Sequence, residues 1–196
     1  MNHASLFSDE FDLIASKFDR KKAEVLPCDY SRVRTIFRDY HYKGEKIGGG
    51  ILQCFGMLYG GRVVGAAVIG APRHEAKYPG AIDIRRMACV DESPRNSESY
   101  FISRIIKWIR KNTHATCVLS YSDLTQGHSG TIYKAANFLC VGETSATVYV
   151  EWNGSTYHPR SLSIERPYSH ELRKAIASGD AKVKTGLPKK IWIYNL

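Results

Sequence analysis

One run of the sequence constrains the fold more than any other: an apolar strand pattern, a long amphipathic helix pattern and a second apolar strand pattern follow one another. Residues 81–90 (AIDIRRMACV) and 115–123 (ATCVLSYSD) supply the strands. A helix that connects two strands of one sheet is a crossover, so we expect these strands to be parallel neighbours. The apolar side chains with helical spacing between them are Phe101, Ile102, Ile105, Ile106 and Ile109.

The flanking segments predict the rest of a mixed sheet. Gly60-Gly61 and Asn153-Gly154 each separate two strand patterns, which is typical of a two-residue hairpin because both turn positions adopt positive φ. The order of the elements predicts an α/β (α+β) fold, with a mixed central sheet flanked by helices and a single domain over residues 1–196. Further helices are expected over residues 30–42, 129–138 and 169–180, and a last strand over 189–196.

Charge indicates a polyanionic partner. The chain has 196 residues, 43% of them hydrophobic, and a net charge of +9. The segment 158–196 holds eight Lys and Arg against three Asp and Glu, so we expect this basic C-terminal segment to contribute to nucleic-acid binding. We expect neither a signal peptide nor a membrane partner, because the first residues carry acids without a basic start and no apolar run is long enough to cross a membrane. Five cysteines without a C-x-x-C pair favour a reducing compartment.

Two arginines stand side by side in the strand 81–90. Strict alternation places Arg86 on the same face as Ile82, Ile84, Ala88 and Val90, toward the core. A buried arginine needs a partner, which leaves two interpretations open: a structural ion pair, or contact with an anion at a site. Arg85 would lie on the opposite face with Asp83, as a surface pair.

Two polar loops follow the two strands. The loop 91–99 (DESPRNSES) precedes the long helix, where backbone N–H groups bind phosphates, although Asn96 or Ser97 as an ordinary N-cap also explains it. The stretch 120–133 (SYSDLTQGHSGTIY) ends a strand with many hydrogen-bonding groups, which favours a site over the alternative, a turn formed by Asp123 and a cap formed by Ser129. His41 and Tyr42 precede a glycine-rich stretch and carry little weight by themselves.

The strand, the loop with Arg95, the long helix, the second strand and the segment 132–143 (IYKAANFLCVGE) together resemble the GNAT-type acyltransferase fold. The resemblance implies that Tyr133 matches a tyrosine that often serves as general acid in these enzymes. The usual donor loop contains glycines, whereas residues 95–100 (RNSESY) contain none, so this backbone cannot approach a pyrophosphate as closely. The residues expected to contact a donor are Arg86, Arg95, Ser97 and Ser99.

More specifically, the segments YHYKG, DIRRMACVDE, SESYFISRIIKWI, SYSDLTQGHSGTIYKAANF and YHPRSLS resemble the phage Mom family of DNA-modification proteins, from about residue 38 onward. The resemblance implies a transferase that adds a carbamoylmethyl group to the exocyclic amine of adenine in phage DNA, in the host cytoplasm, and so protects it from restriction. Acetyl-CoA and iron are both associated with that family. The implied catalytic residues are His41, Tyr42, Ser120, Asp123 and Tyr133, and the implied iron ligands are His41, Asp123 and His128.

The chemistry of adenine sets the requirements of such a site. Its amine is a poor nucleophile on the Watson–Crick edge, so the base of double-stranded DNA must be flipped out, stacked and polarised. Asp123 or His41 could polarise it, and Tyr42, Tyr121 or Tyr133 could stack on it. Simple acetyl transfer lacks the nitrogen of a carbamoylmethyl group, so another acyl donor, a glycyl donor or a metal-assisted route stays open.

Two other function classes remain: a conventional GNAT acyltransferase acting on a protein or small-molecule amine, and a non-catalytic DNA-binding protein. The first predicts a glycine-bearing donor loop, and the second leaves the polar stretch 120–133 unexplained. The sequence leaves the oligomeric state open, a dimer included. The residues expected to contact DNA are Tyr121, Arg160, Lys182, Lys184, Lys189 and Lys190.

Overall fold

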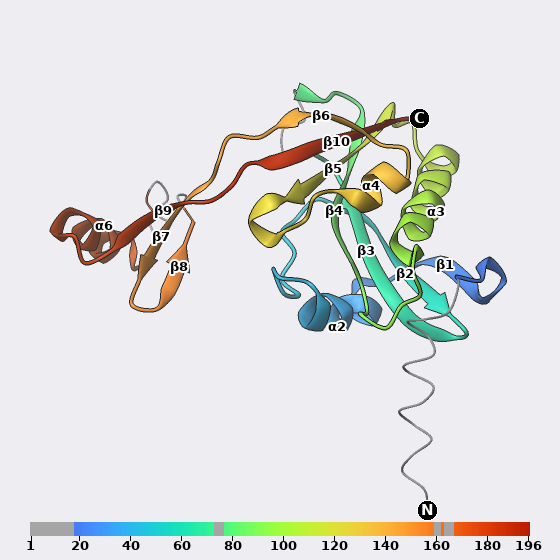
Figure 1. The fold of residues 1–196 in the computed structure, drawn as a ribbon, viewed down its shortest axis with the longest axis horizontal. Coiled ribbons are helices and arrows are strands. Elements are labelled where there is room, and N and C mark those ends of the chain that lie inside the picture. The colour runs from blue at the N-terminus through green and yellow to red at the C-terminus, as the bar shows by residue number, and fades with distance from the viewer. Residues whose placement is uncertain (1–17, 73–76, 159–161, 163–166) are drawn as a thin grey trace, which may run out of the picture. The chain divides into compact units, whose positions relative to one another are not determined.

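The computed structural model of the chain describes residues 18–72, 77–158, 162 and 167–196 (Figure 1). The residues group into two compact units, and the single domain over residues 1–196 stays a prediction from the sequence. The first unit extends to Ser120 and includes residues 131–140 and 192–196; the second comprises residues 121–130 and 141–191. No helix in the described part of the chain is long and apolar enough to span a bilayer.

Most elements of the first unit follow the expected order. A 3-10 turn, η1 (Arg20–Lys22), and strand β1 (Ala23–Cys28) were not expected, because that short stretch has no clear alternation. The other elements are α2 (Tyr30–Tyr40), β2 (Ile51–Tyr59), β3 (Arg62–Gly70), β4 (Ala81–Cys89), α3 (Ser97–Asn112), β5 (Cys117–Asp123) and α4 (Thr131–Ala135).

The central sheet has the strand order β1-β2-β3-β4-β5-β10-β6, where β6 is Leu139–Glu143 and β10 is Lys189–Asn195. The β2–β3 hairpin turns at Gly60 and Gly61, with φ of 57° and 82°, as the sequence predicts. β4 and β5 pair in parallel, Ala81 with Cys117, which confirms the expected crossover through α3. The expected mixed α/β sheet flanked by helices is therefore confirmed.

Each face of strands β2–β4 has its own core, and Figure 1 shows these strands running between α2 and α3. On one side Phe101, Ile105 and Ile109 of α3 are fully buried. On the other side Val33 and Phe37 of α2 pack against the sheet. The amphipathic periods of the two helices thus account for both layers.

A β-bulge at Arg85 overturns the predicted orientation of Arg86. The β3–β4 register passes from Ile69↔Ile84 to Val68↔Arg86, so Arg85 is the extra residue on β4. Ile84 lies in the core against α3, whereas Ala88 lies in the core against α2. The guanidinium of Arg86 stacks 6.0 Å from the ring centroid of Phe37 on α2, so its predicted common face with Ile84 is wrong.

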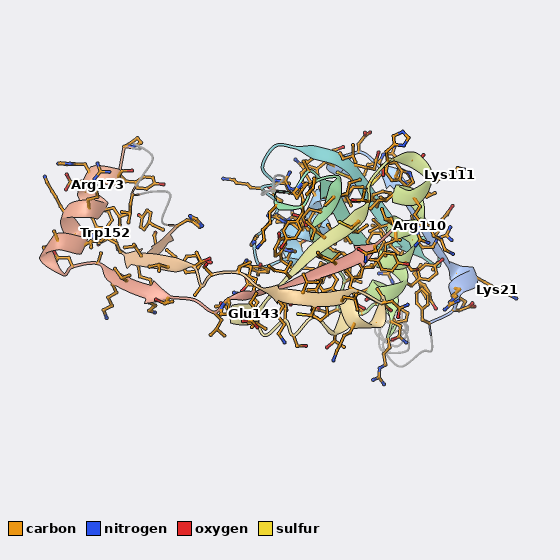
Figure 2. All side chains as sticks on the ribbon, turned by 90° about the horizontal axis from the view of Figure 1, so that it is seen from above. Lys21, Arg110, Lys111, Glu143, Trp152 and Arg173 are labelled. Carbon is orange, nitrogen blue, oxygen red and sulfur yellow. The ribbon has the colours of Figure 1, made fainter. Side chains whose placement is uncertain are left out.

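The second unit contains a three-stranded sheet of order β8-β7-β9. Asn153 and Gly154, with φ of 49° and 70°, form the predicted turn between β7 (Val148–Trp152) and β8 (Ser155–Tyr157). Leu172 of α6 (Ser169–Ser178) packs on Val150 of β7, and Figure 2 shows Trp152 on β7 alongside α6, which carries Arg173. Strand β9 (Lys182–Thr185) and the 3-10 turn η3 (Leu124–Gln126) complete this unit.

We expect Gly70→Ala to destabilise the protein, because two backbone segments approach closely at this glycine. A Cβ on Gly70 would overlap the carbonyl oxygen of Gly50 and lie 2.9 Å from Cδ of Arg85. The backbone would have to shift, at a cost of about 1–3 kcal/mol. Urea unfolding of Gly70→Ala and of Gly49→Ala, whose Cβ would meet nothing within 4 Å, measures the effect. Equal stability of the two variants would contradict the close approach.

Candidate active site

The parallel ladder between β4 and β5 is short. It pairs Ala81, Ile82 and Asp83 with residues 117–119 and then stops, although β4 continues to Cys89. Just beyond it, the hydroxyl of Ser120 lies 3.4 Å from the carbonyl oxygen of Ile84 and donates to it. Ligands of open α/β sheets bind where neighbouring strands stop pairing, so the residues at this point are the first to consider.

A buried polar group lies at the end of this ladder. Ser120, Asp83 and Tyr133 are 1%, 4% and 8% exposed. Burial raises the pKa of Tyr133 to about 12; the Ser120 hydrogen bond acts against this rise, and the charge of Asp83 adds to it. Tyr133 is therefore a neutral phenol over the physiological range, which is the protonation state of a general acid.

Packing fixes the ring of Tyr133. Its centroid lies 5.6 Å from that of Phe138 and 5.9 Å from that of Trp192, and the latter pair is stacked. Sequence reasoning missed Asp83, which it placed in a surface pair with Arg85. An acidic residue inside the apolar strand 81–84 was the signal that could have revealed it.

In the second unit, the side chain of Asp123 contacts Lys189 and Thr125. Its Oδ2 lies 2.6 Å from Nζ of Lys189, and its Oδ1 accepts the backbone N–H of Thr125 at 3.2 Å. The second contact confirms the turn interpretation of this residue, because Asp123 caps the 3-10 turn η3. The Asp123 side chain is 8% exposed and that of Lys189 is 21% exposed, so the carboxylate is held in one orientation by a largely buried ion pair.

His41 and Tyr42 follow the end of α2 in the first unit. Their rings stack at 4.7 Å with an interplanar angle of 18°. Nδ1 of His41 accepts the backbone N–H of Lys43 at 3.1 Å, and Nζ of Lys43 lies 5.2 Å from the Tyr42 centroid. Tyr42 is 45% exposed, so it presents aromatic surface to solvent.

The described residues do not support the implied iron site of His41, Asp123 and His128. Among them, no group of three or more His, Cys, Asp or Glu is arranged to hold a metal ion. His41 belongs to the first unit, whereas Asp123 and the exposed His128 belong to the second. We therefore assign no residue to a metal.

The serine hydroxyls near the start of α3 form hydrogen bonds to backbone carbonyl groups of the same loop. The hydroxyl of Ser97 donates to the Pro94 carbonyl at 2.6 Å, and that of Ser99 donates to the Asn96 carbonyl at 3.1 Å. Asn96 occupies the N-cap position in a left-handed conformation and makes no side-chain capping bond. Arg95 is exposed. Backbone N–H groups of the first turn and Arg95 are thus the groups in this loop that fit an anionic donor.

The lysines expected to contact DNA differ in their surroundings. Lys182 and Lys184 are exposed on β9, in register with Glu151 and Tyr149, on the face opposite Val150 and α6. Lys184 also pairs with Glu151 at 2.8 Å. Lys189 pairs with Asp123, and Lys190 and Tyr121 are half-buried, whereas Arg160 lies outside the described residues.

The model of the Mom protein family matches residues 22–190 of this chain. A protein of Escherichia phage Mu described as methylcarbamoylase mom is 31% identical over 152 residues, which are 72% of this chain and 61% of that protein. The chain thus spans about three-fifths of the length of this relative.

Solved acetyltransferases share the fold. NAA60 of Arabidopsis thaliana, in complex with a bisubstrate analogue, matches with a TM-score of 0.56 at 14% identity over 88% of this chain and 97% of its own. The acetyltransferase yncA of Salmonella typhimurium, with acetyl-CoA, matches with a TM-score of 0.53 at 11% identity over 89% and 94%. At this identity the likeness shows the fold alone, and it confirms the GNAT-type architecture.

Proposed function

Because this chain belongs to the Mom protein family, we propose that it is a transferase that adds a carbamoylmethyl group to the exocyclic amine of adenine in phage DNA. The observation that carries the proposal is the match over most of the chain to the family and to a phage Mu protein described as methylcarbamoylase mom. The net charge of +9 and the exposed lysines on β9 support a DNA substrate. The site of action of such a protein is the host cytoplasm.

We assign the role of general acid to Tyr133. A raised pKa keeps its phenol protonated, and the Ser120 hydroxyl and the rings of Phe138 and Trp192 fix its position. A leaving group that departs with negative charge, such as a thiolate, accepts its proton. The neighbouring carboxylate of Asp83 disfavours the phenolate and so favours the acid form of Tyr133.

Each unit offers candidate groups for the adenine: Asp123 in the second unit, and His41 and Tyr42 in the first. The amine must lose a proton as its new bond forms, and Asp123 is the carboxylate that we assign as acceptor. Tyr42, with its exposed ring beside His41, provides a stacking surface for a base flipped out of the duplex. His41 is the second group that could polarise the amine.

We propose an acyl or glycyl compound as the donor. Acyl transfer from a thioester breaks the C–S bond and forms an N–C(=O) bond, so a glycyl donor gives an amide with the atoms of the carbamoylmethyl group in isomeric order, and a rearrangement must complete the modification. Fold relatives solved with acetyl-CoA or CoA support a CoA thioester as the chemical class of the donor. Arg95 and the first N–H groups of α3 are the residues that would hold its phosphates, since both favour anions. Ser97 and Ser99 shape this turn through their bonds to Pro94 and Asn96.

Mass spectrometry of nucleosides from plasmid DNA tests the proposal. Cells that express this chain should yield deoxyadenosine carrying a carbamoylmethyl group, and cells with an empty vector should not. Unmodified DNA together with tight, salt-dependent binding would instead identify a non-catalytic DNA-binding protein. Unmodified DNA with acetylated protein or small-molecule amines would identify a conventional acyltransferase.

We expect the double variant Lys182→Gln, Lys184→Gln to bind duplex DNA more weakly and with less salt dependence. Each phosphate contact releases about one counterion, so the slope of log affinity against log salt should fall by about two. Titrations of a fluorescent duplex at several salt concentrations measure it. Lys174→Gln, on α6 and paired with Glu171, is the matched control. An unchanged slope in the double variant would exclude β9 from the DNA interface.

A further inference from the structure

Residues 41–50 form an irregular loop whose carbonyl groups are held by side chains from outside it. Nη1 of Arg86 donates to the carbonyl of Gly44, the hydroxyl of Tyr30 to that of Glu45, and Nη1 of Arg85 to that of Gly49. Because the loop is not paired with a strand, its backbone carbonyl groups need hydrogen-bond donors from elsewhere. Side chains from α2 and β4 therefore fix the loop at three points.

The β-bulge brings both arginines to this loop. In a regular strand, consecutive side chains point to opposite faces, and only one of the pair could reach it. The register shift at Arg85 removes that alternation. Arg86 is further confined by its cation–π contact with Phe37, so its guanidinium lies between α2 and the loop.

A short chain of bonds connects Arg86 to His41. The N–H of Gly44 donates to the carbonyl of His41 at 2.7 Å, and the carbonyl of the same Gly44 accepts from Arg86. The N–H of His41 is in turn fixed by the carbonyl of Phe37, on whose ring Arg86 stacks. The backbone that follows the His41–Tyr42 stack is thus tied to this guanidinium through Gly44.

We propose that Arg86 is a positioning residue that holds the His41–Tyr42 stack in place for an extruded adenine, rather than a contact of the group donor. The proposal rests on the proposed function of the chain. Tyr30 and Arg85 share the task by holding the following part of the loop. Misplacement of a stacking group by about 1 Å costs up to about 100-fold in rate, so the effect should be measurable.

Two measurements on Arg86→Gln test the proposal together. Adenine adduct in plasmid DNA should fall about 10- to 100-fold. Trypsin should cleave faster after Lys43 and Lys46, which are exposed on the loop, with no faster cleavage after Lys111, which lies within α3 (Figure 2). Arg86→Lys, which keeps one donor for Gly44, should recover part of both properties.

The controls separate the outcomes. Arg62→Gln, at the exposed start of β3, should change neither the adduct nor the cleavage. If Arg86→Gln does not fold, Tyr30→Phe removes a different tether of the loop and takes its place. Loss of adduct with unchanged cleavage would overturn the proposal and assign Arg86 to the donor. A wild-type protein that makes no adduct would overturn the proposed function, while the cleavage comparison would still decide whether Arg86 holds the loop.

Discussion

Asp123→Asn is expected to abolish DNA modification, with adduct yield reduced at least about 100-fold. The substitution keeps the shape of the side chain and its turn with Thr125 but removes the charge that is proposed to accept a proton. It also places a neutral amide against Nζ of Lys189, so a loss of about 1–3 kcal/mol in the free energy of unfolding should accompany it. Adduct yield and urea unfolding of the purified variant measure the two effects.

The ion pair supplies the control for this prediction. Lys189→Gln alone should retain much of the activity if Asp123 is the proton acceptor. The double variant Asp123→Asn, Lys189→Gln restores a neutral pair and should recover stability but no activity. Activity in the double variant would contradict a catalytic role and would leave Asp123 as a structural partner of Lys189.

Tyr133→Phe has the second largest expected effect, a loss of about 100- to 10,000-fold in modification, because a general acid contributes on this scale. The phenyl ring keeps its packing on Phe138 and Trp192, so the variant should fold, at a cost of about 1 kcal/mol for the lost Ser120 hydrogen bond. Single-turnover measurements on plasmid DNA should show the loss in rate, with DNA affinity unchanged. Wild-type rates in this variant would exclude Tyr133 as the acid.

The same variant should change the stability at high pH. Burial raises the pKa of Tyr133 from 10 to about 12, so the folded protein favours the neutral phenol. The resulting stability is fully present below pH 10 and is lost as the pH rises through 12. It amounts to roughly 2–3 kcal/mol by the usual conversion. The free energy of unfolding of the wild type should therefore fall more steeply above pH 10 than that of Tyr133→Phe. Parallel curves of this free energy against pH would contradict the burial effect.

Most elements of the fold could be predicted from local sequence patterns. The hairpins at Gly60-Gly61 and Asn153-Gly154 follow from the positive φ that these residues accept, and α3 follows from five apolar residues at helical spacing. The parallel pairing of β4 with β5 follows from the crossover between them. Strand β6 was missed because its residues Leu139–Glu143 alternate poorly and are exposed throughout.

The site was less predictable because it depends on pairings between distant segments. Alternation alone could not reveal the bulge at Arg85, since a register shift is a property of two strands together. For the same reason Arg86 was placed on the wrong face. Asp83 was taken for a surface residue because alternation does not show that β4 is buried on both faces over residues 81–84. The partner of Asp123 is Lys189, a residue from β10 that charge counting assigned to DNA. The candidate site residues were proposed from the sequence, whereas their partners required the fold.

The position of β10 has a consequence for the synthesis of the protein. Strands β5 and β6 are separated in the sheet by β10, whose residues, 189–195, follow those of every other strand of that sheet in the sequence. Until the ribosome has released these residues, the emerging chain holds β5 with one exposed, unpaired edge, which is a template for association with other chains. The stacking partner of Tyr133, Trp192, belongs to the same late segment. A nascent chain therefore cannot complete the surroundings of its proposed general acid before residues 189–195 have left the ribosome.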